Sequence, residues 1–322
     1  LEPKEVSMIV KGTTSELNGT VNINVPSGWT VSIQQPHFSL KNKGDEQIIK
    51  ATVTPTNKAL DGPLFASIQI NDETYSKSIS RIEYDHIPYQ FILKDATAKL
   101  VLLDLKKTSQ KIGYIPGAGD DVPACLSQIG YDVTILTDDL IVKEDLSQYA
   151  SIVTGVRAYN KNDRLPVYHE KLMDYVSQGG NLIVQYNTNN RIAPIQTKIG
   201  PFPFTISRDR VTNEQADVRI VNPKHPVLNT PNKISSTDFN DWIQERGIYF
   251  ATAFDKQYET IFSINDPNES PSEGSLIIAK YGKGNFVYTG LAFFRELPAG
   301  IPGAYRLFVN LLSIPQNELD GE

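Results

Sequence analysis

Lys111-Ile112-Gly113-Tyr114-Ile115-Pro116 is an apolar run that opens a repeating pattern of strands and helices. A loop, Gly117-Ala118-Gly119-Asp120, follows it, and then comes a segment with Pro123 near its start and Gly130 at its end. Proline in the first turn and glycine directly after the last turn are start and stop signals of a helix, and an aspartate of the loop can serve as its N-cap. The stretch therefore predicts a buried strand, a loop and a helix, which is the unit of α/β domains.

The same unit recurs along residues 111–322. Apolar, strand-like segments alternate with helix-like ones, and this alternation favours a mostly parallel sheet with right-handed crossovers. A polar insertion rich in Pro, Asn and Asp, residues 188–273, interrupts the pattern before it resumes. The expected strands are 111–116, 132–136, 151–155, 181–186, 275–279 and 285–290, and the expected helices are 122–129, 143–148, 165–176 and 304–312.

Residues 1–84 have a different periodicity. Apolar and polar side chains alternate at every step in 20–25, 30–34 and 66–70, which indicates strands with one buried face. Turn residues separate these short strands, a pattern typical of a β-sandwich. Residues 85–110 are expected to form a linker. The whole chain is therefore expected to be a multidomain β and α/β protein.

Composition excludes several classes of protein. The chain of 322 residues has a net charge of −6, which disfavours nucleic acid as a partner because phosphate binding needs a basic face. No apolar run approaches the roughly 20 residues that span a membrane. A single cysteine allows no intrachain disulfide, and the four histidines have no metal-ligand spacing, so a zinc site of the usual kind is not expected.

Four expected strands end in polar loops. In open α/β sheets ligands bind beyond the carboxyl ends of the strands, so these loops are where a pocket is expected. The alternative is that the loops are polar as loops generally are, held together by pairs of arginine and glutamate. The candidate pocket residues are Asp120, Asp121, Arg157, Tyr159, Asn187, Arg191, Phe294, Arg295 and Glu296.

The insertion carries a second cluster of charged and aromatic residues. One interpretation is an internal salt-bridge network that holds a long loop in shape. The other is a wall that faces carbohydrate, with Trp242 and Tyr249 as stacking platforms and the charged side chains as partners for hydroxyl groups. The residues of the cluster are Arg208, Arg210, Glu214, Trp242, Glu245 and Arg246.

Residues 111–322 resemble the class I glutamine amidotransferase-like superfold, a flavodoxin-like fold that carries a Cys-His-Glu triad in its catalytic members. The family's Gly-x-Cys-x-Gly elbow corresponds to Gly155-Val156-Arg157-Ala158-Tyr159, and its Phe-His-x-Glu motif corresponds to Phe293-Phe294-Arg295-Glu296. Arg157 thus stands in the nucleophile's place and Phe294 in that of the base. The resemblance implies that triad chemistry is absent. Trimerisation domains of some β-galactosidases use the same superfold without catalysis.

The whole chain is similar to the C-terminal region of large bacterial PIG-L-type deacetylases, the N-acetylglucosaminyl de-N-acetylase superfamily. The stretches that carry this likeness are 84–88, 112–120, 155–160, 244–247, 293–298 and 303–307, and residues 25–32 resemble an Ig-like module associated with α-galactosidases. The family's catalytic zinc domain uses a His-Pro-Asp-Asp motif that this chain does not contain.

The resemblance implies an Ig-like sandwich followed by a flavodoxin-like domain, together forming the accessory part of a longer, periplasmic or secreted enzyme. No cofactor is expected in this chain, and zinc is expected only in an upstream domain. The implied partners are that upstream deacetylase domain of the same polypeptide and an amino-sugar glycan, with homo-oligomerisation left open. Two alternatives stay open: a hydrolase with a repurposed site of Asp120, Arg157 and Glu296, and a purely structural or oligomerisation module.

Overall fold

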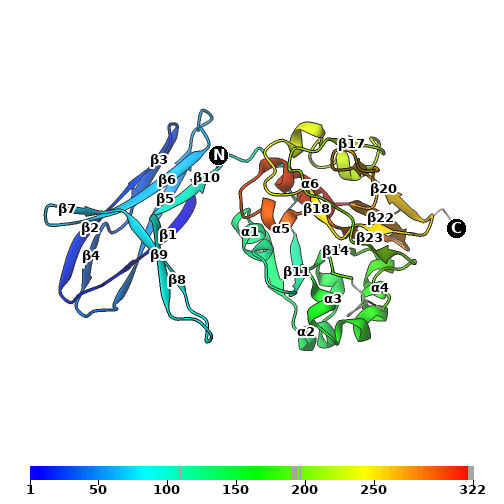
Figure 1. Ribbon diagram of the computed structural model, residues 1–322, viewed down its shortest axis with the longest axis horizontal. Helices are drawn as coiled ribbons and strands as arrows, with labels where there is room; N and C mark the ends of the chain where they lie inside the picture. Colours follow the sequence, from blue (N-terminus) through cyan, green and yellow to red (C-terminus); the bar gives the residue numbers. More distant parts are fainter. Residues whose placement is uncertain (109, 190–194, 196, 318–322) are drawn as a thin grey trace. The chain divides into compact units, whose positions relative to one another are not determined.

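The structure is a computed structural model that describes residues 1–317 except 109, 190–194 and 196. The chain divides into two compact units, Leu1–Leu103 and Asp104–Glu322 (Figure 1). The first unit is built of strands, and the second combines a mixed sheet with helices. The chain is therefore a multidomain β and α/β protein.

The first unit contains two antiparallel sheets around one apolar core. One sheet has the order β1-β5-β3, and the other has the order β10-β6-β2-β4, with β7 paired to β6. Their inward-facing side chains, among them Val21, Phe38 and Val53, are buried as the alternation predicts. The strands are β1 Lys4–Lys11, β2 Leu17–Asn24, β3 Trp29–Ile33, β4 His37–Leu40, β5 Glu46–Pro55, β6 Gly62–Ile70, β7 Glu73–Tyr75 and β10 Thr97–Leu100.

The expected linker over residues 85–110 differs from the structure. Strand β9, Gln90–Asp95, pairs with β8, Lys77–Ile82, and β10 pairs with β6. Leu100 of β10 is buried in the sandwich core, so this strand belongs to the first unit. The boundary between the units lies between Leu103 and Asp104.

The second unit is organised by a seven-stranded sheet with the order β12-β11-β13-β14-β23-β22-β20. Neighbours from β12 to β23 are parallel, whereas β22 and β20 join antiparallel. The central strands are buried on both faces, as helix-covered strands must be. The strands are β11 Lys111–Ile115, β12 Asp132–Ile135, β13 Ser151–Thr154, β14 Asn181–Gln185, β20 Tyr258–Thr260, β22 Leu276–Tyr281 and β23 Gly284–Thr289.

Helices connect and cover these strands. In place of the expected helix 143–148, the structure has two shorter elements, α2 and the 3-10 turn η1. The Thr137 side chain caps α2, and the Asp145 side chain caps η1. The expected helix 165–176 begins with the 3-10 turn η2 and continues as α4. The elements are α1 Val122–Gln128, α2 Asp138–Lys143, η1 Leu146–Gln148, α3 Ala158–Lys161, η2 Leu165–Tyr168, α4 His169–Ser177, α5 Phe293–Glu296 and α6 Pro302–Leu312.

The insertion between β14 and β22 forms short paired strands and two 3-10 turns. Three antiparallel pairs, β15·β19, β16·β18 and β17·β21, give it its shape. Its elements are β15 Thr205–Ile206, β16 Arg210–Val211, β17 Val218–Ile220, η3 Pro226–Leu228, η4 Ser236–Phe239, β18 Gly247–Ile248, β19 Ala251–Thr252 and β21 Phe262–Ile264. No helix among the described residues is long and apolar enough to cross a membrane.

Candidate functional site

The loops after β11 and β13 lie against each other, and Asp120 holds them together. One oxygen of its carboxylate accepts hydrogen bonds from the Tyr114 hydroxyl and, at 3.1 Å, from the Val122 amide. The other oxygen accepts from the Val156 amide of the neighbouring loop at 3.0 Å. Asp121, beside it, is exposed and makes no side-chain cap bond to α1. Asp120 therefore fastens two loops and does not point into an open pocket.

Two glycines allow these loops to approach closely. A Cβ atom on Gly117 would lie 2.1 Å from the Val156 carbonyl oxygen, and one on Gly155 would lie 2.7 Å from the Gly117 nitrogen. The Ala118 amide donates to the Val156 carbonyl at 2.8 Å. Backbone thus fills the space between the carboxyl ends of β11 and β13, where a flavodoxin-like order would place a ligand.

Three other expected pocket residues are buried. The Asn187 side chain accepts from the Tyr159 amide at 2.9 Å and donates to the Gln185 carbonyl at 3.0 Å. Tyr159 is buried beneath the strand ends, and its hydroxyl has no hydrogen-bond partner among the described residues. Glu296 is wholly buried and accepts from the Ile243 amide at 3.0 and 3.2 Å. These side chains support the loops from within and are not exposed to a ligand.

Burial also changes the acidity of Glu296. Loss of solvent raises the pKa of its carboxyl to about 7, and the Ile243 amide, Arg246 and Arg295 counteract this only in part. A raised carboxyl pKa can mark a general acid. A general acid must also reach a substrate, which this buried side chain does not.

An arginine–aromatic cluster covers the ends of β13, β14 and β23. Arg157 adopts the left-handed conformation, with φ 59°, directly after β13, and its buried Nε has no partner among the described residues. Tyr186 stacks on Tyr249 at 5.8 Å, and Phe294 lies 5.2 Å from Tyr186. The Arg295 guanidinium lies 4.8 Å from the centre of the Phe294 ring.

Most side chains of this cluster contact one another, although the Arg157 Nε stays without a partner among the described residues. Arg157 and Arg295 both lower the pKa of the Tyr186 hydroxyl, although burial raises it more. Arg295 donates to Glu245 at 2.9 Å. Because neighbouring side chains cover the rings, the cluster closes the strand ends more than it opens them. Arg191, expected in the same pocket, lies outside the described residues.

Four residues of the expected insertion wall are structural. Trp242 is buried, donates to the Asp238 carbonyl at 3.0 Å and packs on Phe239 and Phe293, so the prediction that it is a stacking platform is wrong. Buried Arg246 donates to the carbonyls of Ala216 and Phe239, and burial lowers its pKa. The other two accept hydrogen bonds: Glu214 from the Gln244 amide at 2.8 Å and Glu245 from Arg295.

Arg208 and Arg210 have a different environment. They are exposed, and within the part of the chain that the structure describes their side chains make no ion pair or hydrogen bond. Both line a cavity of about 640 Å³ together with Phe254. The rest of its lining comes from β16, β19 and the loop after β21, including Asp209, Thr212, Thr252, Asn265, Asp266, Glu269, Ser270, Ser272 and Glu273. This cavity is called the insertion cleft below.

The far wall of the insertion cleft is held rigidly. Asp266 accepts hydrogen bonds from the Thr212 and Asn213 amides and the Thr212 hydroxyl, all at 2.8 Å. Burial raises the pKa of Asp266, but these bonds and the charge of Arg210 lower it overall. Asn265 accepts from Arg219 at 2.7 Å. The sequence analysis missed this wall, because 265–272 carries only the Pro, Asn and Ser signal of a turn. Nothing in that signal places the loop opposite Arg208.

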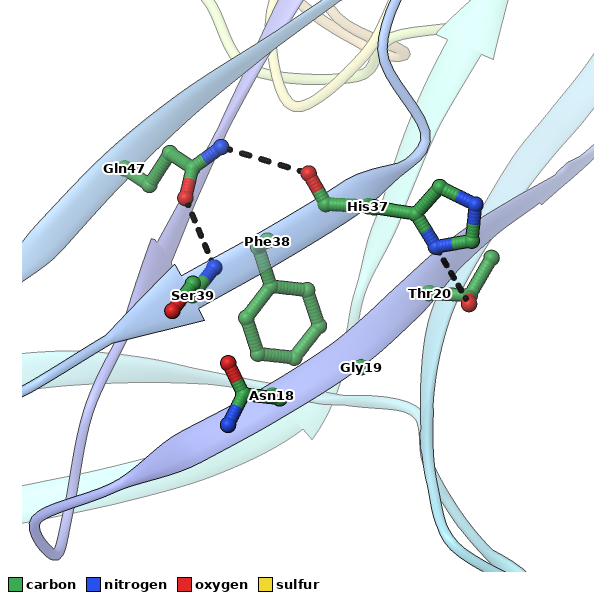
Figure 2. Close-up of a pocket in the computed structure, with 7 residues that line it drawn as sticks. All are labelled: Asn18, Gly19, Thr20, His37, Phe38, Ser39 and Gln47. Carbon is green, nitrogen blue, oxygen red and sulfur yellow. Dashed lines mark hydrogen bonds between the residues drawn. The ribbon is translucent and has the colours of Figure 1, made fainter.

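A shallow hollow of about 500 Å³ lies on the first unit, over β2 and β4. Figure 2 shows the Gln47 side chain bridging the edge of β4, where it accepts from the Ser39 amide at 3.0 Å and donates to the His37 carbonyl at 3.4 Å. The amide of Gln47 thus takes the place that a neighbouring strand would occupy, which protects this edge from further pairing. Among the described residues, no group of three or more His, Cys, Asp or Glu could hold a metal ion.

No family model and no curated protein matches this sequence. Among solved structures, the chain is similar to a cytoplasmic protein of Salmonella typhimurium LT2, with 14% identity and a TM-score of 0.40 over 64% of this chain and 100% of that one. It is also similar to β-galactosidases from Rahnella sp. R3 (14%, TM-score 0.35) and Bacillus circulans sp. alkalophilus (14%, TM-score 0.37). These likenesses cover 65% and 66% of this chain but only 32% of each galactosidase. Neither activity nor ligands are transferred from proteins this distant.

Proposed function

We propose that this chain is a non-catalytic accessory region of a PIG-L-type amino-sugar deacetylase and that it binds glycan in the insertion cleft. The proposal includes an Ig-like first unit and a flavodoxin-like second unit. The strand order of the second unit supports the latter, because numbering its parallel strands along the chain gives 2-1-3-4-5. A periplasmic or secreted location belongs to the same proposal and rests on the sequence resemblance.

The geometry at the strand ends supports a non-catalytic role. The hydrolase alternative needs Asp120 and Glu296 to converge around an open cavity. Asp120 instead accepts backbone hydrogen bonds from two loops, and Glu296 is wholly buried. Arg157, in the nucleophile's place, is no nucleophile because its guanidinium stays protonated.

The insertion cleft is the observation that carries the glycan proposal. Its cavity of about 640 Å³ falls in the range of roughly 300–1,000 Å³ typical of small-ligand sites. Arg208 and Arg210 supply guanidinium donors that make no described hydrogen bond, and Asp209 and Glu269 supply carboxylate acceptors. Vicinal sugar hydroxyls need donors and acceptors side by side, and half-buried Phe254 offers an apolar contact for a sugar ring.

Calorimetric titration of the whole chain with amino-sugar oligosaccharides tests this proposal. Both N-acetylated and de-N-acetylated forms are used, with a neutral glucose oligosaccharide as a third ligand. We expect binding that Arg210→Gln weakens about fivefold to tenfold, which corresponds to the loss of one charged hydrogen bond of about 1 kcal/mol. Lys256→Gln, an exposed lysine that does not line the cleft, is the matched control. No heat with any of the three at millimolar concentration, from a folded sample, would refute the proposal.

A further inference from the structure

The hairpin of β8 and β9 exposes an unusual amount of apolar surface. Seven large apolar side chains between residues 79 and 93 are 36–62% exposed. Figure 1 shows β8 and β9 as a two-stranded ribbon that extends past the other strands of the first unit, and no described strand pairs with its outer edges. The seven residues are Ile79, Tyr84, Ile87, Tyr89, Phe91, Ile92 and Leu93.

An isolated two-stranded hairpin is marginally stable in water, and exposed apolar patches of several hundred Å² mark interaction surfaces. The cross-strand register places Ile79, Phe91 and Leu93 on one face of the hairpin and Ile92 on the other. Ile79 lies opposite Leu93, and Arg81 lies opposite Phe91 two residues further along, so all four project to the same side.

The hydrogen-bond pattern shows which backbone groups of β9 are free. The Ala96 amide donates to the Ser76 carbonyl at 2.8 Å, and bonded pairs alternate along an antiparallel ladder. The pair Ser80·Ile92 is therefore a bonded pair, and the N–H and C=O groups of Phe91 and Leu93 point away from β8. These outward groups form a ready edge for another antiparallel strand.

We propose that the β9 edge pairs with β9 of a second copy of this chain, forming a four-stranded antiparallel sheet across a two-fold axis at Ile92. In this register Phe91 of each copy lies opposite Leu93 of the other, and both use their outward-facing backbone groups. Lys94 then faces Gln90 and Tyr89 faces Asp95, so no like charges oppose each other. The equivalent pairing of β8 would set Ile79 against Arg81, which is a poorer match.

The pairing brings apolar side chains of the two copies together beside the two-fold axis. Phe91 of each copy packs beside Leu93 of the other on one face of the new sheet, and the two Ile92 side chains lie next to each other on the opposite face. Both faces of this edge-to-edge contact are therefore apolar. This interaction is independent of the insertion cleft, which lies in the other unit.

A single cysteine at the two-fold axis tests the register. Ile92 would face its own copy as a non-bonded pair with Cα atoms about 4.5 Å apart, within the roughly 4.4–6.8 Å range of disulfides. We expect oxidised Ile92→Cys to migrate mainly as a disulfide-linked dimer on a non-reducing gel. Ile48→Cys is the matched control, since Ile48 is 62% exposed on β5, a strand with neighbours on both edges. Native Cys125 is buried and common to both variants.

Sedimentation of the unmodified chain gives an independent measurement. We expect a concentration-dependent monomer–dimer equilibrium whose dissociation constant rises at least tenfold in Leu93→Lys and stays unchanged in Ile48→Lys. The proposal is overturned if the unmodified chain remains monomeric at its highest soluble concentration. It is equally overturned if Ile92→Cys crosslinks no more than Ile48→Cys, because another surface would then mediate any dimer.

Discussion

The strand ends of the second unit and the insertion cleft are both polar and both contain arginines, yet their side chains are used differently. At the strand ends Asp120, Asn187 and Glu296 accept hydrogen bonds from backbone amides, and aromatic rings cover one another. In the insertion cleft the side chains of Arg208 and Arg210 make no described hydrogen bond or ion pair and line a cavity. Polar composition alone does not separate a structural cluster from a binding site.

The difference between the two regions lies in how many of their polar groups form hydrogen bonds within the protein. A polar group whose hydrogen-bonding capacity is met inside the protein stabilises the fold, whereas one that is left unmet at the surface is available to a ligand. This contrast is why we propose the insertion cleft, and not the carboxyl ends of the strands, as the ligand site of the second unit. Each of the following predictions tests one side of that contrast.

The largest expected effect is a pH dependence of stability at the closed strand ends. Burial raises the pKa of Glu296 to about 7 in the folded chain, from 4.5. Between these values the unfolded chain has lost the proton and the folded chain keeps it, so stability falls as pH rises and levels off above about pH 7. We expect roughly 3 kcal/mol of such loss in the free energy of unfolding, absent in Glu296→Gln.

Urea unfolding of the chain from pH 4 to 8 measures this slope. The exposed Glu269, changed to Gln in the same way, is the control, and its profile should run parallel to that of the unmodified chain. If Glu296→Gln leaves the slope unchanged, this carboxyl is accessible to solvent and the strand ends are more open than the contacts indicate.

A methyl group added between the loops after β11 and β13 should lower the free energy of unfolding by nearly as much. In Gly117→Ala the added Cβ would meet the Val156 carbonyl at 2.1 Å, and we expect a loss of about 2 to 3 kcal/mol from overpacking. Gly119→Ala, in the same loop, has open space around its Cβ and bears only the strain of φ +101°, about 1 kcal/mol. Equal losses in chemical denaturation would mean that the two loops do not touch.

Removing the negative charge of Asp120, which joins the loops after β11 and β13, should have the next largest effect on stability. Asp120→Asn places an amide donor where the Val156 N–H or the Val122 N–H needs an acceptor, and we expect a loss of about 2 kcal/mol in the free energy of unfolding. Asp121→Asn changes a neighbouring, exposed carboxylate without a cap bond and should stay within about 0.5 kcal/mol. If both variants lose a similar free energy of unfolding, Asp120 does not join the two loops.

The strands and helices around the sheet were largely predictable from sequence. Buried strands such as 151–155 and 285–290 have β-branched and aromatic residues at their centres and end in glycine, and their boundaries in the structure differ by one residue at most. Strands β9 and β10 were missed, since residues 85–110 were expected to form a linker. The side chains of β9 are all exposed, so no buried face produces an alternation there. Burial, not propensity, generates the pattern that sequence analysis detects.

The site was less predictable, for a related reason. Residue types at the strand ends indicate polarity but not which backbone donors of distant loops consume it, as Ile243 does for Glu296. One of the two interpretations of the insertion placed Trp242 on a carbohydrate-facing wall, yet it packs against Phe293 of a segment some fifty positions away. In both cases, contacts between residues far apart in the sequence determine whether the side chain is buried.

The smallest expected effect separates the two interpretations of the insertion cluster. A salt-bridge network would stabilise the fold, so Arg208→Gln combined with Arg210→Gln would then lower the free energy of unfolding by more than about 1 kcal/mol. Because neither guanidinium makes a described hydrogen bond or ion pair, and the exposed Arg210 acts on Asp266 only through its charge, we expect a change below about 0.5 kcal/mol. Arg246→Gln, which removes a buried guanidinium from two carbonyls, is the positive control and should cost about 2 kcal/mol or more. A neutral double variant that also loses glycan affinity would assign these arginines to binding alone, whereas a destabilised one would place them on the structural side of the contrast.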